Sequence, residues 1–150
     1  MQWCLRMPHY RKNKNHKVYA IHAAAAKKSG VCAFCELKAD SYQVIKIAEH
    51  FKIIKNIFPY DNWDARDVLD HLMITPIMHT ESLSTLGDEA AIEFVKLMSG
   101  YEKQGYDVYA RSPHSTVKSV PHQHTHLIKT GGKNHKAIIH LQKPYISITF

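Results

Sequence analysis

The chain is poor in cysteine, and this scarcity excludes one class of small protein. Its 150 residues include three cysteines, an odd number that does not suit a scaffold of paired disulfides. Such a composition is typical of proteins kept in a reducing compartment. We therefore expect a cytoplasmic protein that folds without disulfides.

Long apolar runs are also missing. No stretch approaches the ~20 apolar residues that cross a bilayer, and the first residues lack the apolar segment of a secretory signal. We therefore expect no membrane partner. Internal repeats and long low-complexity segments are absent as well. A chain of 150 residues with 45% hydrophobic and 22% charged residues predicts a globular domain large enough for one core.

Acidic residues are the scarcer charge. There are 13 Asp and Glu against 20 Lys and Arg, which gives a net charge of +7. This balance favours an anionic partner, such as a nucleotide, a phosphate ester or nucleic acid. Part of the excess lies in RKNKNHK, residues 11–17. We expect residues 1–17 to form a basic, solvated N-terminal arm and 18–150 to form a single domain. The arm either aids solubility or binds nucleic acid.

The pattern of apolar residues predicts strands, one long helix, and then further strands. Helices are expected over 18–30 and 87–105, the second capped by Asp88 or Ser84. Its predicted core stripe is Ala91, Phe94, Val95, Met98 and Tyr101. Residues 59–68 are expected to form a loop. Strands are expected over 42–49, 51–58, 70–76, 106–112, 120–129, 136–142 and 145–150. This order is typical of an α+β fold, an antiparallel sheet with a helix packed on one face.

Three histidines alternate in KSVPHQHTHLIK, residues 118–129. Side chains two apart on a strand share a face about 6.6 Å apart. His122, His124 and His126 are therefore expected in one row. Imidazoles titrate near neutrality and bind metals, so such a row indicates catalysis or metal binding. A histidine-rich surface strand is the alternative.

A second short pattern, CAFC, places Cys32 and Cys35 after the first predicted helix. The spacing suits half of a zinc site, which histidines would have to complete because no second such pair exists. A redox pair is a weaker alternative, since the pair follows a helix and precedes a strand. The third interpretation is two cysteines buried as small apolar residues.

Four segments together resemble one family. These are CAFC (32–35), KNIFP (55–59), HLMITPIMHTESL (71–83) and SVPHQHTHLI (119–128). In their order they resemble the zinc-bearing branch of the histidine triad superfamily, over residues 32 to about 130. The resemblance implies an antiparallel sheet with one long helix packed on it, a short N-terminal helix, a zinc knuckle and a homodimer.

The resemblance also implies an activity. The chain would be a nucleotide hydrolase or nucleotidyltransferase that acts at an α-phosphate through a covalent nucleotidyl-histidine. His124 corresponds to the nucleophile, because a neutral imidazole attacks well at pH 7. His126 would bind a phosphoryl oxygen or help the leaving group depart, and His71 would support this group. Nucleotides, dinucleoside polyphosphates, nucleoside phosphoramidates and adenylated nucleic-acid ends are the implied substrates.

Further site residues follow from the same resemblance. The implied substrate-binding residues are Asn56, Ile57, Phe58, Arg111, Lys118 and Ser119. The implied ligands of a structural Zn²⁺ are Cys32, Cys35, His79 and His122, a donor set suited to tetrahedral zinc.

Two departures from the family pattern stand out. Asn56 replaces an acidic residue expected to hold the ribose. Gln123 and Thr125 stand between the histidines in place of apolar residues, which predicts a less buried far face for that strand.

Two other functions remain open from the sequence. One is a nucleotide-binding regulatory module with little turnover, which the intact histidine row disfavours. The other is a basic zinc module that binds nucleic acid. Its binding would weaken with salt and would survive replacement of His124, whereas an enzyme would lose turnover and keep binding.

Overall fold

The computed structural model describes residue 11 and residues 13–135, 138–142 and 145–149. Its main sheet is antiparallel, with strand order β1-β2-β4-β6-β5, and β3 pairs with β4. The strands are β1 (Val44–Ile47), β2 (Phe51–Lys55), β3 (Asn62–Trp63), β4 (Arg66–Pro76), β5 (Asp107–Ala110) and β6 (Thr125–Asn134). The predicted α+β fold is confirmed.

The core lies between the sheet and α2 (Asp88–Glu102). Alternate residues of the central strands face this helix, because successive side chains of a strand point to opposite faces. Phe94 of α2 packs on Phe51 with ring centroids 5.5 Å apart. The buried core residues are Phe51, Ile53, Leu72, Ile74, Phe94 and Leu127.

Helix α2 differs from its prediction at its first turn and in its apolar stripe. Gly87 occupies the N-cap without a side-chain cap, so neither Asp88 nor Ser84 caps the helix. Val95 is 58% exposed. The helix residues on the core are Ala90, Phe94, Leu97, Met98 and Tyr101, which follow the three- and four-residue spacing without Val95.

The predicted loop over 59–68 is partly a hairpin. β3 and β4 pair through Asn62 with Asp67 and Trp63 with Arg66. Asp64 and Ala65 form the turn with φ of 48° and 58°, the sign that a tight two-residue hairpin turn requires. The hairpin begins β4 at Arg66, four residues before the predicted strand start, and it positions Tyr60 and Trp63 beside the histidines.

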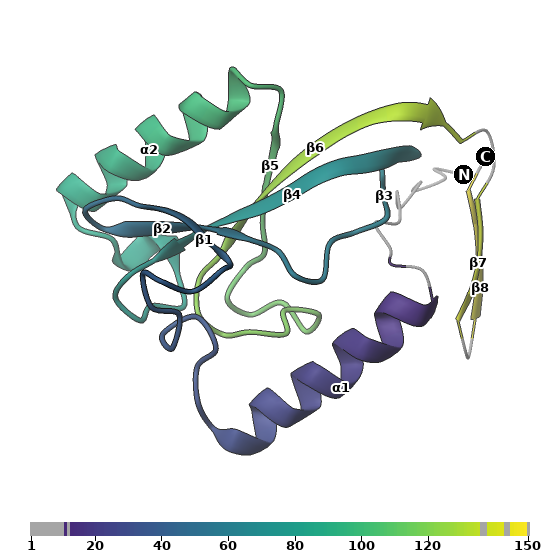
Figure 1. Ribbon diagram of the computed structural model, residues 1–150, viewed down its shortest axis with the longest axis horizontal. Coiled ribbons are helices and arrows are strands. Elements are labelled where there is room, and N and C mark those ends of the chain that lie inside the picture. Colours follow the sequence, from purple (N-terminus) through teal and green to yellow (C-terminus); the bar gives the residue numbers. More distant parts are fainter. Residues whose placement is uncertain (1–10, 12, 136–137, 143–144, 150) are drawn as a thin grey trace.

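Most other strands are shorter than predicted. β1 and β2 end before 49 and 58, and β5 covers only Asp107–Ala110. Near the C-terminus, β7 (Ile138–Gln142) pairs with β8 (Tyr145–Thr149) as a separate two-stranded sheet at one end of the molecule (Figure 1). Residues 136, 137 and 150 of the two predicted strands lie outside the described residues.

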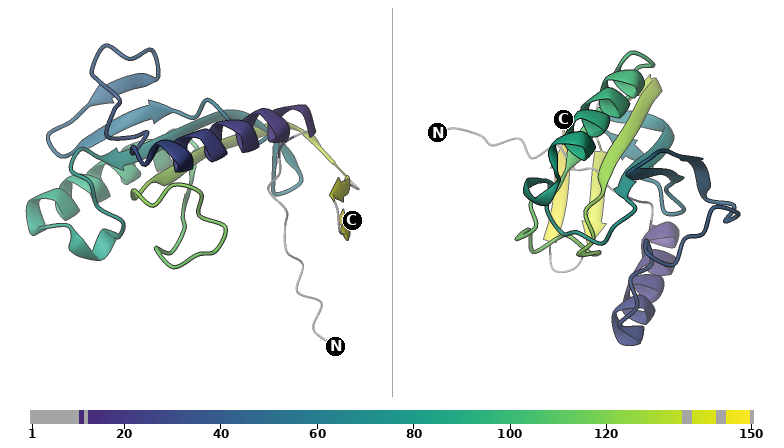
Figure 2. Two further views of the ribbon diagram at one scale, coloured as in Figure 1. Left: turned by 90° about the horizontal axis from the view of Figure 1, so that it is seen from below. Right: turned by 90° about the vertical axis from the view of Figure 1, so that its left-hand side faces the viewer.

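Helix α1 (Asn13–Ser29) lies on the side of the sheet opposite α2 (Figures 1 and 2). It begins five residues before the predicted start. Residues 13–17 of the expected arm are therefore helical, with 15–17 exposed as expected of a solvated segment, whereas Arg11 is partly buried. The physical reason is that Arg11 and Tyr19 pack against Phe58 and Tyr60. None of the described helices is both long and apolar enough to span a membrane.

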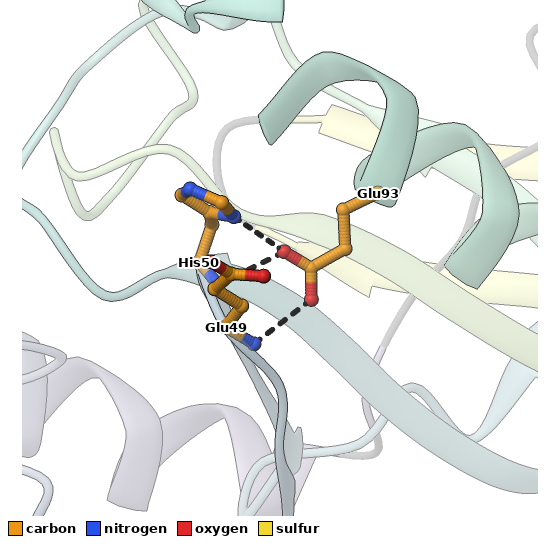
Figure 3. Close-up of polar contacts among 3 residues, drawn as sticks. All are labelled: Glu49, His50 and Glu93. Atoms are coloured by element: carbon orange, nitrogen blue, oxygen red, sulfur yellow. Dashed lines mark hydrogen bonds and ion pairs between the residues drawn. The ribbon is translucent and has the colours of Figure 1, made fainter. Parts of the chain in front are cut away.

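A carboxylate fixes α2 to the turn between β1 and β2. Glu93 accepts hydrogen bonds from the backbone N–H groups of Glu49 at 3.0 Å and His50 at 2.9 Å, and Nδ1 of His50 lies 2.7 Å away (Figure 3). Partial burial raises the pKa of Glu93, but these hydrogen bonds outweigh it and hold the pKa below its ordinary value of 4.5. The carboxylate thus locks the helix to the sheet.

Replacing Glu93 with glutamine should lower stability at neutral pH by about 1 kcal/mol, or roughly 2–4 °C in Tm. A carboxyl whose pKa is lowered on folding stabilises the protein above its unfolded pKa. That contribution is lost as the pH falls through the folded pKa. Thermal melts between pH 7 and pH 3 should therefore show the two proteins converging. Glu102→Gln, on an exposed side chain of the same helix, should give a small difference without this trend. A Glu93 effect independent of pH would contradict the electrostatic explanation.

Candidate functional site

The three alternating histidines lie side by side, but only the last is in a strand. β6 begins at Thr125, so the predicted strand over 120–129 is wrong for its first half. The backbone N–H of Gln123 donates instead to the carbonyl of Thr80 at 2.6 Å. All three rings remain in a row: Phe34 contacts His122 and His124 at 5.7 and 5.3 Å, and His124 contacts His126 at 5.0 Å.

The middle histidine is held in one tautomer. Nδ1 of His124 donates to the carbonyl oxygen of His122 at 2.8 Å. Because a neutral imidazole carries one proton, Nε2 then bears the lone pair. Burial lowers the pKa of His124, the hydrogen bond to His122 raises it, and the charges of Lys118 and Arg111 lower it further. The net lowering keeps the ring neutral and nucleophilic at pH 7.

The last histidine is the end of a hydrogen-bonded chain. The backbone N–H of Tyr60 donates to Nδ1 of His71 at 3.2 Å, and Nε2 of His71 lies 2.9 Å from Nδ1 of His126. His71 accepts at Nδ1, so its proton is on Nε2 and is donated to His126. Neutral His126 must therefore carry its own proton on Nε2. Burial lowers the pKa of His126 well below 6.5, so it is a neutral donor.

Asn56 is placed behind this chain. It is 7% exposed, and its side-chain oxygen accepts from the backbone N–H of Phe58 at 2.9 Å. Its nitrogen lies 3.4 and 3.2 Å from the two ring nitrogens of His71. In this structure Asn56 therefore shapes the 56–60 turn and packs on His71, while its ribose contact remains a prediction.

The far face beside the histidine row is buried, against expectation. Gln123 is 2% exposed and Thr125 is 1% exposed. Thr125 lies in β6, which is flanked by both β4 and β5. Gln123 is covered by the segment that carries Thr80 and by Lys118, whose Nζ lies 3.4 Å from its side-chain oxygen. Nε2 of Gln123 and Oγ1 of Thr125 have no hydrogen-bond partner within the described chain.

The two cysteines meet the first histidine of the row. Sγ of Cys32 and Sγ of Cys35 lie 3.4 and 3.5 Å from Nδ1 of His122, and Sγ of Cys35 lies 3.3 Å from Nδ1 of His79. All four ligand atoms fall within 4.8 Å of one another. Zinc–sulfur and zinc–nitrogen bonds at a tetrahedral centre give S···N edges of about 3.6 Å. The donor set and its spacing therefore fit a closed metal site.

The neighbours of this cluster orient its ligands. Nε2 of His122 donates to the carbonyl of Pro76 at 3.0 Å, which leaves Nδ1 unprotonated toward the thiols. Burial lowers the pKa of His122 to about 4, and burial followed by the neighbouring Cys32 raises the pKa of Cys35. A bound cation would reverse the shift at Cys35. Lys52 anchors the knuckle by donating to the carbonyls of Phe34 and Leu37 at 3.2 and 2.7 Å.

Of the remaining predicted substrate residues, Lys118 and Arg111 act on His124 through their charges. Nζ of Lys118 donates to the carbonyl of Glu81 at 2.9 Å. Arg111 lies over the ring of Tyr109 at 5.3 Å. Phe58 packs against His22 and Tyr19 of α1. Ile57 and Ser119 are exposed, and their contacts with substrate remain predictions.

An aromatic wall formed by Tyr60, Trp63 and Tyr109 lies beside His126. Tyr60 stacks on Trp63 at 5.8 Å, and Trp63 contacts Tyr109 at 5.2 Å. The rings of Tyr60 and Tyr109 lie 5.8 and 5.9 Å from His126. The aromatic loop residues were visible in the sequence, but the hairpin that brings them to the site depends on two non-glycine residues at positive φ.

Comparison with known proteins gives matches in structure only. No family model matches the sequence, and no curated protein matches it. A HIT family hydrolase from Clostridium thermocellum is 21% identical, covering 67% of this chain and 90% of that one, with a TM-score of 0.48. A HIT family hydrolase from Legionella pneumophila Philadelphia 1 is 20% identical, covering 69% and 94%, with a TM-score of 0.48. A histidine triad protein from Clostridium difficile is 20% identical, covering 68% and 91%, with a TM-score of 0.42. In fold and in the order of its sequence motifs, the chain resembles the histidine triad family.

Proposed function

We propose that this chain is a nucleotide hydrolase or nucleotidyltransferase of the histidine triad type, with His124 as the nucleophile. The observation that carries the proposal is the fixed tautomer of His124. Its Nδ1–H is held by the carbonyl of His122 at 2.8 Å, so the Nε2 lone pair faces away from that bond. The cations Arg111 and Lys118, whose charges reach His124, favour a phosphate substrate.

The reaction would proceed by two displacements. The Nε2 lone pair of His124 forms a bond to the α-phosphorus while the bond to the leaving group breaks. The leaving group takes that electron pair, and the Nε2–H of His126 stabilises the developing negative charge by hydrogen bonding, while any proton the leaving group needs comes from water. A water molecule then attacks phosphorus and loses a proton to solvent, the N–P bond breaks, and its electrons return to Nε2. The carbonyl of His122 stabilises the positive charge on the nucleotidylated ring through the Nδ1–H.

We also propose that Cys32, Cys35, His79 and His122 hold a structural Zn²⁺. When bound, the ion would crosslink the knuckle to the histidine segment and would leave no open position for water. The support is the set of four ligand atoms within 4.8 Å, together with the Nε2–H of His122 bound to Pro76. The metal would fix the backbone whose carbonyl holds His124.

A homodimer is part of the same proposal. β5 is an edge strand of the main sheet, and Ile92 and Val95 of α2 are largely exposed. An open edge beside apolar helix residues is a surface that a second copy would cover.

The test is intact-protein mass spectrometry under denaturing, non-acidic conditions after brief mixing with adenylated and guanylated compounds. Wild-type protein should gain the mass of a nucleoside monophosphate, because the attack leaves the nucleotide on nitrogen. His124→Ala should gain no mass while still binding nucleotide. His114→Ala is the matched control, since this exposed histidine lies outside the row and the variant should label like wild type.

Other outcomes point to the two other functions. Nucleotide binding without an adduct or product from any compound would favour a regulatory module with little turnover. Salt-sensitive nucleic-acid binding that survives His124→Ala, again without turnover, would favour a basic zinc module. Labelling of His124→Ala at the wild-type level would rule out this nucleophile.

A further inference from the structure

The arginine that precedes α1 reaches the histidine site. Nε of Arg11 donates to the carbonyl of Phe58 at 2.7 Å. Its guanidinium carbon lies 4.2 Å from the ring centre of Tyr19 and 4.7 Å from that of Tyr60. One nitrogen is thus bound to the 56–60 turn and the planar group lies against two aromatic rings, which fixes its position.

The rest of this guanidinium lacks a partner within the described chain. Its two terminal nitrogens make no hydrogen bond there, and no carboxylate lies within ion-pair distance. Asp61 is near enough to affect the charge, but it also receives the side-chain amide of Asn15 at 3.3 Å. Burial lowers the pKa of Arg11. A partly desolvated cation with two unused donors is unfavourable by itself and is suited to an anion.

A second guanidinium shares the same aromatic wall. Arg111 acts by its charge on Tyr60, on Arg11 and on His126. Two positive charges close together repel each other, and an anion bound beside both of them relieves that repulsion. The forked donors of arginine match the oxygens of a phosphate group better than a lysine would. The pair therefore forms a place for phosphate oxygens beside Tyr60.

The cations are divided between the two histidines. The charge of Lys118 acts on His124 and that of Arg11 acts on His126, while Arg111 acts on both. In the proposed mechanism His124 attacks the α-phosphorus and His126 donates a hydrogen bond to the leaving group. The leaving group therefore lies next to His126. Arg11 therefore lies on the side of the leaving group, next to Tyr60.

We propose that Arg11 is a specificity-determining residue that binds a phosphate group of the leaving group. This inference rests on the proposed function. It assigns a substrate class, nucleotides whose leaving group is itself phosphorylated, over those whose leaving group is an uncharged amine or alcohol.

The test compares two substrates that transfer the same adenylyl group to His124. Diadenosine tetraphosphate has a phosphorylated leaving group, and adenosine 5′-phosphoramidate releases ammonia. Arg11→Gln should lower kcat/KM for the tetraphosphate by about 10- to 100-fold, as expected for lost charged hydrogen bonds. The value for the phosphoramidate should change by less than about threefold. Arg11→Lys keeps the positive charge but lacks the paired donors of a guanidinium. It should recover part of the kcat/KM that Arg11→Gln loses for the tetraphosphate.

Lys17→Gln removes the same charge from an exposed position of α1 and should leave both substrates at wild-type rates. Equal losses for both substrates in Arg11→Gln and Arg11→Lys, with a lower Tm, would make Arg11 a structural anchor and overturn the inference. Unchanged rates in both variants would overturn it too, as would a wild-type protein that turns over only the phosphoramidate. Wild-type protein that turns over neither substrate would instead refute the proposed function, and this inference with it.

Discussion

Replacing His126 with leucine should slow turnover by about 100- to 1,000-fold, the range expected when a positioned hydrogen-bond donor to developing negative charge is removed. The donor is the Nε2–H of His126, fixed because His71 donates to its Nδ1 at 2.9 Å. Leucine fills a similar volume in a buried position without a donor. Steady-state kinetics should show the loss mainly in kcat, because this hydrogen bond strengthens as negative charge develops on the leaving group.

A donor-preserving variant separates chemistry from packing. His126→Gln keeps an N–H group and should retain more activity than leucine. His71→Phe should give an intermediate loss, because it frees His126 to place its proton on Nδ1. Tm values should stay close together across the series for the kinetic comparison to hold. Full activity in His126→Leu would show that this hydrogen bond does not contribute to turnover.

Replacing Cys35 with serine should abolish zinc binding at the proposed site and lower Tm by roughly 8–16 °C. Sγ of Cys35 lies 3.3 and 3.5 Å from the Nδ1 atoms of His79 and His122. Its loss would remove a ligand atom that contacts both histidines. Loss of a structural metal ligand belongs to the largest single-residue effects, about 4 kcal/mol, and each kcal/mol is worth about 2–4 °C at this chain length. Elemental analysis should find one zinc per chain before the change and little after it.

The third cysteine offers a matched control. Cys4→Ser makes the same chemical change outside the described residues and should leave the zinc content unchanged. A chelator should lower the Tm of wild-type protein toward that of Cys35→Ser and leave Cys35→Ser itself unaffected. Wild-type protein without metal, but with a disulfide between Cys32 and Cys35, would support the redox alternative.

The sequence was most informative where chemistry or periodicity repeats. Alternating residues predicted the central strands, and three- and four-residue spacing predicted α2. The motif resemblance predicted that Cys32, Cys35, His79 and His122 form one cluster, as they do in the structure. These features depend on local patterns or on motif order, so they can be recognised without knowing the tertiary contacts.

The rest depended on contacts between distant segments. Arg11 was expected in a solvated arm because it lies in a basic run, yet Phe58 and Tyr60 hold it. Gln123 looked like a surface residue by polarity, but the segment that carries Thr80 covers it. Tyr60 and Trp63 were expected in a loop because the turn at Asp64 and Ala65 contains no glycine, the residue that usually indicates a two-residue hairpin turn. Tertiary packing overrode composition in each case.

His122 belongs to both the cysteine cluster and the histidine row. Its ring faces the cysteines, while its carbonyl holds the proposed nucleophile, His124, in one tautomer. A metal ion that does not touch the reacting phosphorus would then determine the fraction of catalytically active molecules. It would not change the turnover rate of each active molecule. A partly loaded sample would behave as a mixture of active and inactive protein with a single apparent KM. Specific activity is therefore meaningful only when it is divided by the metal content of the same sample.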